Sequence, residues 1–235
     1  MLKFIYMATF AGIFTIFTSN ANAQDFDKGL AFSKNGDFAA AMKEWRPLAE
    51  QGHAVAQNNL GVMYGKGEGV LKDAAEAVRW YHLAAEQGYA VAQFNLGNMY
   101  YNGEGVLKDA VEAVRWYRLA AEQGDAGAQY NLGFMYVTGD GVLKDAAEAV
   151  RWYRLAAEQG DAGAQNSLGF MYGTGKGVLK DAVTAHMWHN ISSAAGVESA
   201  GKRRDKLETK MTPEQIAIAV QRAKTCMSSN YIKCD

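Results

Sequence analysis

Residues 89–124 read YAVAQFNLGNMYYNGEGVLKDAVEAVRWYRLAAEQG, and this stretch decides the fold because the chain repeats it. Its features recur at a constant interval of 36 residues. A fixed period of this size is typical of stacked supersecondary units, so the sequence predicts a repeat protein. The recurring features are Leu-Gly at 60–61, 96–97, 132–133 and 168–169, Lys-Asp beginning at 72, 108, 144 and 180, and tryptophan at 80, 116, 152 and 188.

Each unit contains two apolar stripes with helical spacing, separated by a loop with two glycines. Paired glycines such as Gly67 and Gly69 allow positive φ angles and a tight turn between two helices. Asp73 stands where its side chain can cap the second helix. We therefore expect two helices in every unit and no strands. In the first unit the stripes are Ala56, Leu60, Met63 and Tyr64, then Ala77, Tyr81, Ala84 and Ala85.

The shared pattern A-x-A-Q-x-N-L-G-x-M-Y-x-x-G-x-G-V-x-K-D-x-x-E-A-x-x-W-Y-x-x-A-A-E-Q-G resembles the Sel1-like repeat, a relative of the tetratricopeptide repeat with a longer loop. The resemblance covers about residues 53–196, as four repeats over 53–88, 89–124, 125–160 and 161–196, the last with a divergent second helix. We expect an all-α, right-handed α/α solenoid of about five helix pairs with a C-terminal capping helix.

The two ends of the chain depart from the repeat. Residues 24–52 are expected to form an N-terminal capping helix pair, in which Trp45 falls one residue off the register of the other tryptophans. At the other end, residues 197–235 are expected to form a cap and a cysteine-containing tail. Thr212, Pro213 and Gln215 form a capping box that predicts a last helix over about 213–225.

The first 23 residues have the pattern of a secretory signal peptide. Lys3 precedes an apolar run over 4–17, and Ala21-Asn22-Ala23 provides the small residues of a cleavage site after Ala23. A membrane anchor is the alternative, but the run is shorter than the roughly 20 residues that span a bilayer. We expect a bacterial periplasmic or secreted protein with no later membrane span, and no lipobox cysteine follows the signal.

Cys226 and Cys234 are the two cysteines of the chain. In an exported protein a close, even pair usually forms a disulfide, which here would pin the tail. Two free thiols or part of a metal site are the alternatives. Acidic and basic residues nearly balance, at a net charge of −1, and no long basic run exists. The sequence therefore gives no support for nucleic-acid binding.

Three motifs could indicate chemistry, and each has a structural interpretation that we favour. Ser199-x-x-Lys202 matches the S-x-x-K of serine β-lactamases, but its S-D-N and K-T-G partners are missing. His186 and His189 share a helix face without a third metal ligand, so packed or partly exposed histidines are expected. The glycines at 65, 67 and 69 follow no strand and read as a turn. We expect no catalysis, no metal and no cofactor.

Candidate binding residues lie on the first helix of each unit, at the positions equivalent to 58, 62 and 65. These positions are expected to lie opposite the core stripe, on the concave wall of the solenoid. Exposed aromatic side chains there would act as binding anchors, whereas the alternative is that they pack between units. The candidates are Asn58, Val62, Phe94, Asn98, Tyr101, Tyr130, Phe134, Asn166 and Phe170.

The resemblance implies a non-catalytic scaffold that binds a protein or peptide in its concave groove. A β-lactam or peptidoglycan-fragment binder with weak β-lactamase-like activity is the alternative, because some cysteine-rich relatives have that assignment. Those relatives bridge each repeat with a cysteine pair, which this chain lacks. A structural role in the envelope is a third hypothesis. The sequence leaves the partner and the oligomeric state open.

Overall fold

The computed structural model describes residues 18–234, and these residues form twelve α-helices and no strand. The helices are α1 (Thr18–Lys34), α2 (Phe38–Glu50), α3 (Ala54–Lys66), α4 (Ala74–Glu86), α5 (Ala90–Asn102), α6 (Ala110–Glu122), α7 (Ala126–Thr138), α8 (Ala146–Ala157), α9 (Ala162–Thr174), α10 (Ala182–Ala194), α11 (Glu198–Glu208) and α12 (Pro213–Ser228).

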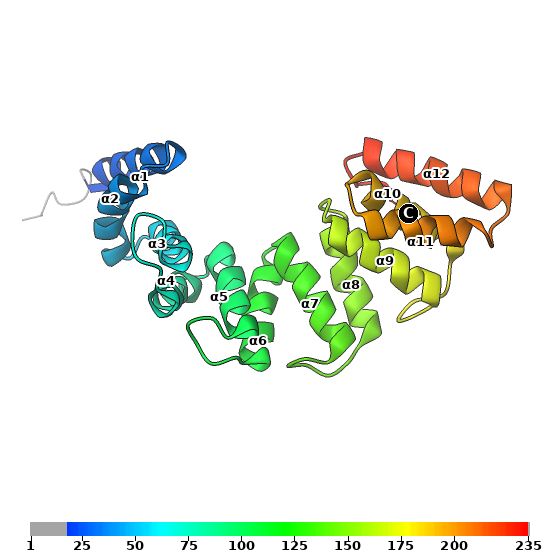
Figure 1. Ribbon diagram of the computed structural model, residues 1–235, viewed down its shortest axis with the longest axis horizontal. Helices are drawn as coiled ribbons and strands as arrows, with labels where there is room; N and C mark the ends of the chain where they lie inside the picture. The colour runs from blue at the N-terminus through cyan, green and yellow to red at the C-terminus, as the bar shows by residue number, and fades with distance from the viewer. Residues whose placement is uncertain (1–17, 235) are drawn as a thin grey trace, which may run out of the picture.

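The helices follow one another along an arc, as Figure 1 shows, with α1 and α2 at one end and α10 to α12 at the other. From α1 to α11 each helix packs against its neighbours in sequence, and α12 packs back on α10. Contacts between sequence neighbours alone define a solenoid. The prediction of an all-α repeat solenoid is confirmed.

The predicted signal peptide lies largely outside the described residues, which begin at residue 18. Residues 18–23 fall within α1, and cleavage after Ala23 stays a prediction. Among the helices of residues 18–234, none combines the length and the apolar character that a membrane crossing requires.

The two glycines of each loop have different structural tasks. Gly103 ends α5 in the left-handed region, at φ 75°, and its N–H donates to the carbonyl of Met99. Gly105 lies so close to the start of α4 that a Cβ there would stand 2.2 Å from the carbonyl oxygen of Ala74. One glycine therefore turns the chain, and the other lets the loop contact the preceding unit. The prediction that these glycines are structural is confirmed.

The core of the second repeat includes leucine, alanine, methionine and one tyrosine, as the pattern predicts. Leu96 is fully buried in α5, and the Tyr117 ring of α6 lies over Gly97. A Cβ on Gly97 would stand 2.7 Å from that ring, so only glycine fits. Asp109 caps α6 by accepting hydrogen bonds from the N–H groups of Val111 and Glu112.

Glutamine side chains join each unit to the one before it. Gln93 is buried, and its amide donates to the carbonyl of Ala85 at 3.1 Å. Gln123 then donates to Oε1 of Gln93 at 2.7 Å. Both polar ends of Gln93 are therefore satisfied inside the solenoid, where an unpaired amide would destabilise the fold.

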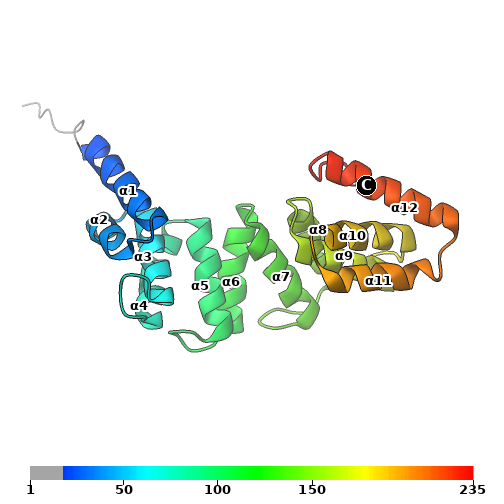
Figure 2. The ribbon, with the colours of Figure 1, turned by 45° about the horizontal axis from the view of Figure 1, so that its top comes forward.

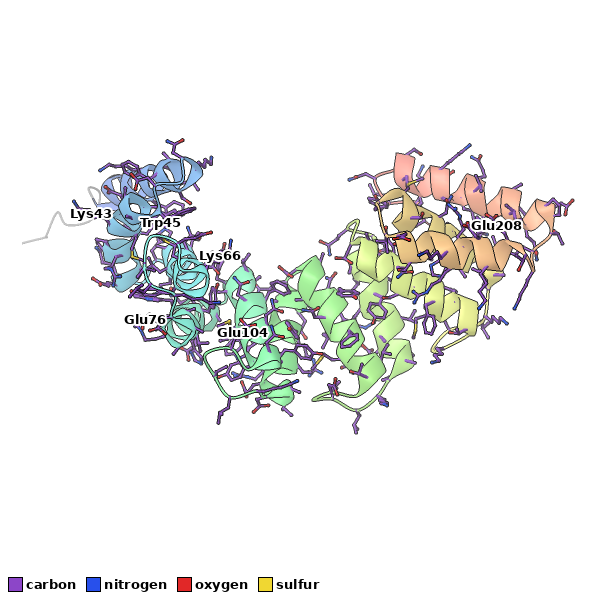
Figure 3. All side chains as sticks on the ribbon, viewed as in Figure 1. Lys43, Trp45, Lys66, Glu76, Glu104 and Glu208 are labelled. Atoms are coloured by element: carbon purple, nitrogen blue, oxygen red, sulfur yellow. A yellow bond between two sulfur atoms is a disulfide. The ribbon has the colours of Figure 1, made fainter. Side chains whose placement is uncertain are left out.

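Both ends of the arc are closed. At the N-terminal end, the Trp45 indole, labelled in Figure 3, donates to the carbonyl of Phe26 at 3.1 Å. At the C-terminal end, α12 packs on α10, as Figure 2 shows. The predicted capping box of Thr212 and Gln215 opens α12, and the predicted disulfide joins Cys226 to Cys234.

The region between the last repeat and α12 differs from the prediction. We expected a single helix after residue 196, but residues Glu198–Glu208 form α11 as well. This helix has no apolar stripe and buries Ala200 against α10. An ion pair of 2.5 Å between Glu198 and Lys202, at positions i and i+4, supports the helix on its solvent side.

Candidate functional site

Helices α5, α7, α9 and α11 follow one another along the arc in Figure 1, and we call them the odd-helix row. Three hollows lie along this row. The α5–α7 hollow has a volume of about 330 Å³, the α7–α9 hollow about 180 Å³ and the α9–α11 hollow about 280 Å³. The α5–α7 hollow is lined by Asn98, Tyr101, Asn102, Tyr117, Tyr130, Asn131, Phe134 and Met135.

The floor of the α5–α7 hollow is a small hydrogen-bonded network. The Tyr117 hydroxyl donates to Oδ1 of Asn98 at 2.7 Å, and the Asn131 amide donates to the same oxygen at 3.2 Å. Burial raises the pKa of the Tyr117 phenol, which therefore stays protonated and remains a donor at neutral pH. The network fixes the polar floor beneath the aromatic walls.

Five of the nine predicted binding residues line the three hollows, and the other four do not. Phe134 and Phe170 keep 38% and 37% of their surface exposed, although both are large apolar side chains. Both line hollows, as do Asn98, Tyr101 and Tyr130, which are half-buried. Val62, Phe94 and Asn166 are half-buried as well.

Phe94 and Tyr130 contact the second helix of their own unit and the first helix of the next unit. The Phe94 ring lies 6.2 Å from the Tyr117 ring, and the Tyr130 ring lies 5.8 Å from the Tyr153 ring. The first helix of the next unit has a glycine where it faces the ring. A Cβ on Gly127 would stand 3.1 Å from Phe94. At this register the two rings therefore lie between the second helix of their own unit and the first helix of the next.

For Asn58 the expected outward orientation is wrong. The side chain is buried, with 5% exposure, and its Oδ1 accepts a hydrogen bond of 3.0 Å from the Asn95 amide. Position 58 lies opposite the core of its own unit, but the first helix of the next unit covers it. Asn166 stands at the same register in α9 and accepts from Arg203 of α11 at 3.0 Å.

The two histidines of α10 are packed, in agreement with the sequence prediction. His186 is fully buried, and its Nε2 lies 2.7 Å from Oε1 of Glu208 on α11, labelled in Figure 3. His189 is 2% exposed, and burial lowers its pKa to about 4, with contributions from Arg203 and His186. Within residues 18–234 no group of three or more His, Cys, Asp or Glu side chains could hold a metal ion.

The serine and lysine of the S-x-x-K motif do not form a nucleophile and base pair. Lys202 is exposed and ion-paired with Glu198 at 2.5 Å. Ser199 is exposed too, and its Oγ accepts from the Asn166 amide at 3.5 Å. A serine nucleophile needs a neighbouring base that is held ready to take its proton, and here the lysine is a solvated partner of a carboxylate.

Two surface features were missed by the sequence analysis. One is a hollow of about 420 Å³ along α6, lined in part by Val111, Arg115 and Leu119, which we call the α6 hollow. The other is a leucine that stands in every loop just before the Lys-Asp pair. It recurs in all four repeats, but the sequence analysis assigned it no function. The four loop leucines are Leu71, Leu107, Leu143 and Leu179, with exposures of 88–89%.

Comparisons with known proteins agree with this geometry. Solved structures with similar folds include c5321, a protective antigen present in uropathogenic Escherichia coli strains and displaying an SLR fold. That chain is 36% identical, with a TM-score of 0.78 over 88% of this chain and 46% of its own length. The present chain therefore spans less than half of that protein.

Two further structures are similar. A Sel1 repeat protein from Oxalobacter formigenes is 38% identical, with a TM-score of 0.72 over 77% of this chain and 74% of its own. A Sel1 repeat structure from Klebsiella pneumoniae subsp. pneumoniae has 20% identity and a TM-score of 0.52, over 81% of this chain and 97% of its own, and shows the fold alone. The comparison with curated proteins found no match.

The profile of the Sel1 repeat matches residues 54–89, 90–125, 126–161 and 162–197. These four matches cover more than half of the chain and coincide with the helix pairs from α3 to α10. The chain belongs to the Sel1 repeat family.

Proposed function

We propose that the protein is a non-catalytic scaffold that binds an extended segment of a partner protein along the odd-helix row. Proteins built from Sel1 repeats are in general protein-interaction scaffolds. The observation that carries the proposal for this chain is the series of adjoining hollows, each with an aromatic side chain open to solvent.

The hollows adjoin because they share side chains. Phe170 and Arg203 line both the α7–α9 hollow and the α9–α11 hollow. Phe134 and Val137, one turn apart on α7, line the α5–α7 and α7–α9 hollows respectively. An extended peptide could place successive side chains in successive hollows. Burying the exposed faces of Phe134 and Phe170 would then supply apolar contact area at little cost in side-chain entropy.

The α6 hollow is larger than any hollow of the odd-helix row, but its two arginines are already occupied. Arg115 pairs with Glu112 at 3.1 Å and stacks on the Trp116 ring at 4.6 Å. Arg118 donates to the Tyr136 hydroxyl at 3.0 Å. A partner there would have to displace these contacts. In the odd-helix row the cations over the Phe170 ring, Lys176 and Arg203, stand further from it, at 5.4 and 5.6 Å.

We propose in addition that the protein acts in the bacterial envelope or outside the cell. The sequence before residue 24 has the order of a signal peptide. The disulfide between Cys226 and Cys234 is typical of an oxidising compartment. The related protein of uropathogenic Escherichia coli is described as a protective antigen, which supports exposure of this type of chain outside the cytoplasm.

A site-specific crosslinking experiment tests the binding surface. A photoreactive phenylalanine analogue replaces Phe134 in cells that produce the full chain, and adducts are detected after irradiation. The matched control carries the analogue at Leu119, which is 37% exposed against 38% for Phe134 but lies in the α6 hollow. We expect a discrete adduct from position 134 and none from position 119.

A second pair repeats the comparison further along the chain, with Phe170 at 37% exposure and Leu155 of α8 at 36%. Fractionation of the cells before irradiation shows in which compartment the adduct forms. Adducts from positions 119 and 155 alone would place the partner on the second helices and overturn the proposal. Equal adducts from all four positions would indicate nonspecific contact and would overturn it as well.

A further inference from the structure

The α9–α11 hollow differs from the other two in the charge of its walls. Arg203 and Lys206 of α11 and Lys210, just after this helix, line it, and no acidic side chain does. Its remaining walls are small or apolar. They consist of Gly169, Phe170, Gly173 and Thr174 from α9, His189 from α10 and Leu207 from α11.

This hollow exists because the fourth repeat has smaller side chains at two positions. In the second repeat Tyr117 reaches past Gly97 and places its hydroxyl on Asn98, and Tyr101 forms part of the wall. In the fourth repeat His189 takes the place of that tyrosine and lies over Gly169 without a hydroxyl. Gly173 takes the place of Tyr101. The fourth repeat therefore lacks the tyrosine hydroxyl that forms part of the polar floor of the α5–α7 hollow.

None of the three cations has an acid to balance it. Among the described residues, Lys206 and Lys210 make no ion pair. Arg203 donates to Oδ1 of Asn166 and stands 5.6 Å from the centre of the Phe170 ring, which leaves its charge unpaired as well. The acids of α11 are paired elsewhere, Glu198 with Lys202, Asp205 with Arg204, and Glu208 with His186.

His189 adds a buried polar group that the fold leaves without a partner. It is 2% exposed, and its Nδ1 has no hydrogen-bond partner within residues 18–234. Burial keeps its pKa near 4, so the ring is neutral at pH 7 and retains one N–H donor. Buried polar groups are nearly always hydrogen-bonded. Because its ring is neutral, His189 adds no charge to the hollow, and the positive charge of its walls comes from Arg203, Lys206 and Lys210.

We propose that the α9–α11 hollow binds a carboxylate side chain of the partner segment, while apolar side chains of the same segment occupy the α7–α9 and α5–α7 hollows. The inference rests on the proposed function. Phe170 and Arg203 belong to both the charged hollow and the neighbouring apolar one, so a ligand in one continues into the other. A carboxylate can accept hydrogen bonds from Arg203 and the lysines, and charge-assisted bonds of this kind fix orientation.

The occupant is therefore an extended peptide with a defined polarity. An acidic residue lies at one end, over α9 and α11, and aromatic or aliphatic residues lie toward α5. Charge complementarity also explains why the cations concentrate at α11, beyond the last repeat, and not along the whole row.

A peptide-display selection on the full chain tests this arrangement. Random dodecamers are selected on the parent protein and on the double variant K206Q/K210Q. The matched control is K224Q/K233Q, which removes two exposed lysines from α12 and the tail. We expect the parent and the control to enrich peptides with Asp or Glu to one side of apolar residues. The K206Q/K210Q variant should keep the apolar preference and lose the acidic one.

A selected peptide, once synthesised, is expected to bind K206Q/K210Q about tenfold more weakly than the parent at low salt, and the difference should shrink as salt is added. Enrichment of apolar peptides without acids on the parent would overturn this inference and leave the proposed function standing. Equal loss of acidic preference in both double variants would overturn it too, because attraction would then be nonspecific. No enrichment on any variant would contradict the proposed function itself.

Discussion

The third and fourth repeats have nearly the same first helix but very different second helices. Leu132 and Leu168 are both fully buried, and Gly133 and Gly169 both face a ring of the second helix. In α8 that ring is Tyr153, whereas in α10 it is His189. The first helices follow one packing rule along the whole solenoid, while the second helix of the last repeat adapts to new neighbours, α11 and α12.

The end of the second helix differs as well. Gln159 donates to Oε1 of Gln129 at 2.8 Å in the third repeat. The equivalent residue of the fourth repeat is Ala195, and Oε1 of Gln165 is buried with no hydrogen-bond partner among the described residues. Ser192 supplies a different bond, from its Oγ to the carbonyl of Ala162 at 2.7 Å. The last repeat therefore gives up one internal hydrogen bond where the solenoid changes into its cap.

The shared glycine should be the most sensitive point of both repeats. A Cβ at position 133 would stand 2.8 Å from the Tyr153 ring, and one at 169 would stand 2.6 Å from His189. We expect Gly133→Ala and Gly169→Ala each to lower the free energy of unfolding by about 3 kcal/mol, because the ring must move in a packed core. Chemical denaturation monitored by circular dichroism measures the loss.

Gly173→Ala is the matched control for these two variants. Gly173 is also inside α9, but a Cβ there would meet only the Cβ of Ala185, at an ordinary 3.5 Å. Alanine is the better helix former, so this variant should unfold with a free energy equal to that of the parent or up to about 1 kcal/mol higher. A loss as large as that of Gly133→Ala would show that the destabilisation does not depend on contact with a ring.

His189 should make the fourth repeat sensitive to acid. An unfolded histidine takes up a proton near pH 6.5, whereas the folded pKa is about 4 because of burial, Arg203 and His186. Between these values the unfolded chain binds more protons, so the stability falls as the pH falls from 6.5 toward 4. We expect a loss of up to about 3 kcal/mol.

Thermal unfolding at pH 7 and at pH 4.5 checks this prediction in His189→Tyr, which restores the residue of the other repeats. The variant should lose less stability between the two pH values than the parent does. His82→Arg is the control. It also replaces a second-helix histidine by the residue that the second and third repeats have at that position, but it leaves His189 in place. An unchanged pH dependence in His189→Tyr would assign the acid sensitivity to other groups.

The fold was predictable because the repeat period encodes contacts between sequence neighbours. Gly103, Asp109 and Leu96 each have a local task that repeats identically, so their pattern alone predicts the helix pair. α11 could not be predicted, because it has no apolar stripe and depends on α10 for its packing. The sequence of the segment itself does not show that it becomes helical by packing on α10.

The candidate site was predictable only in outline. Helical spacing gives the angle of a side chain around its own helix but not the position of the next helix. Phe134 and Asn58 were therefore grouped together, although the following unit buries Asn58 through its contact with Asn95. The α9–α11 hollow depends on the missing tyrosine at His189 and on the placement of α11, which the sequence analysis did not provide.

Restoring the lost glutamine should strengthen the fourth repeat by a smaller amount. The backbone at Ala195, with φ −81° and ψ 7°, is close to that of Gln123, with φ −84° and ψ 0°. Ala195→Gln could therefore donate to the unpaired Oε1 of Gln165. We expect a gain of about 1 kcal/mol. Ala194→Gln, one residue earlier and exposed, should give no gain, and an equal gain in both denaturation curves would contradict the proposed hydrogen bond.

The smallest effect on stability is expected at the loop leucines, which are exposed in both the third and the fourth repeat. Leu143 and Leu179 are 88% and 89% exposed, whereas Leu132 is fully buried in the same fold. Leu143→Asn and Leu179→Asn should each change the free energy of unfolding by less than about 0.5 kcal/mol, while Leu132→Ala should cost about 2 to 5 kcal/mol. Denaturation curves of the three variants separate these cases. A loss above 1 kcal/mol in one loop variant alone would mean that the loops of the third and fourth repeats are packed differently, so that the divergence between these repeats would extend beyond their second helices.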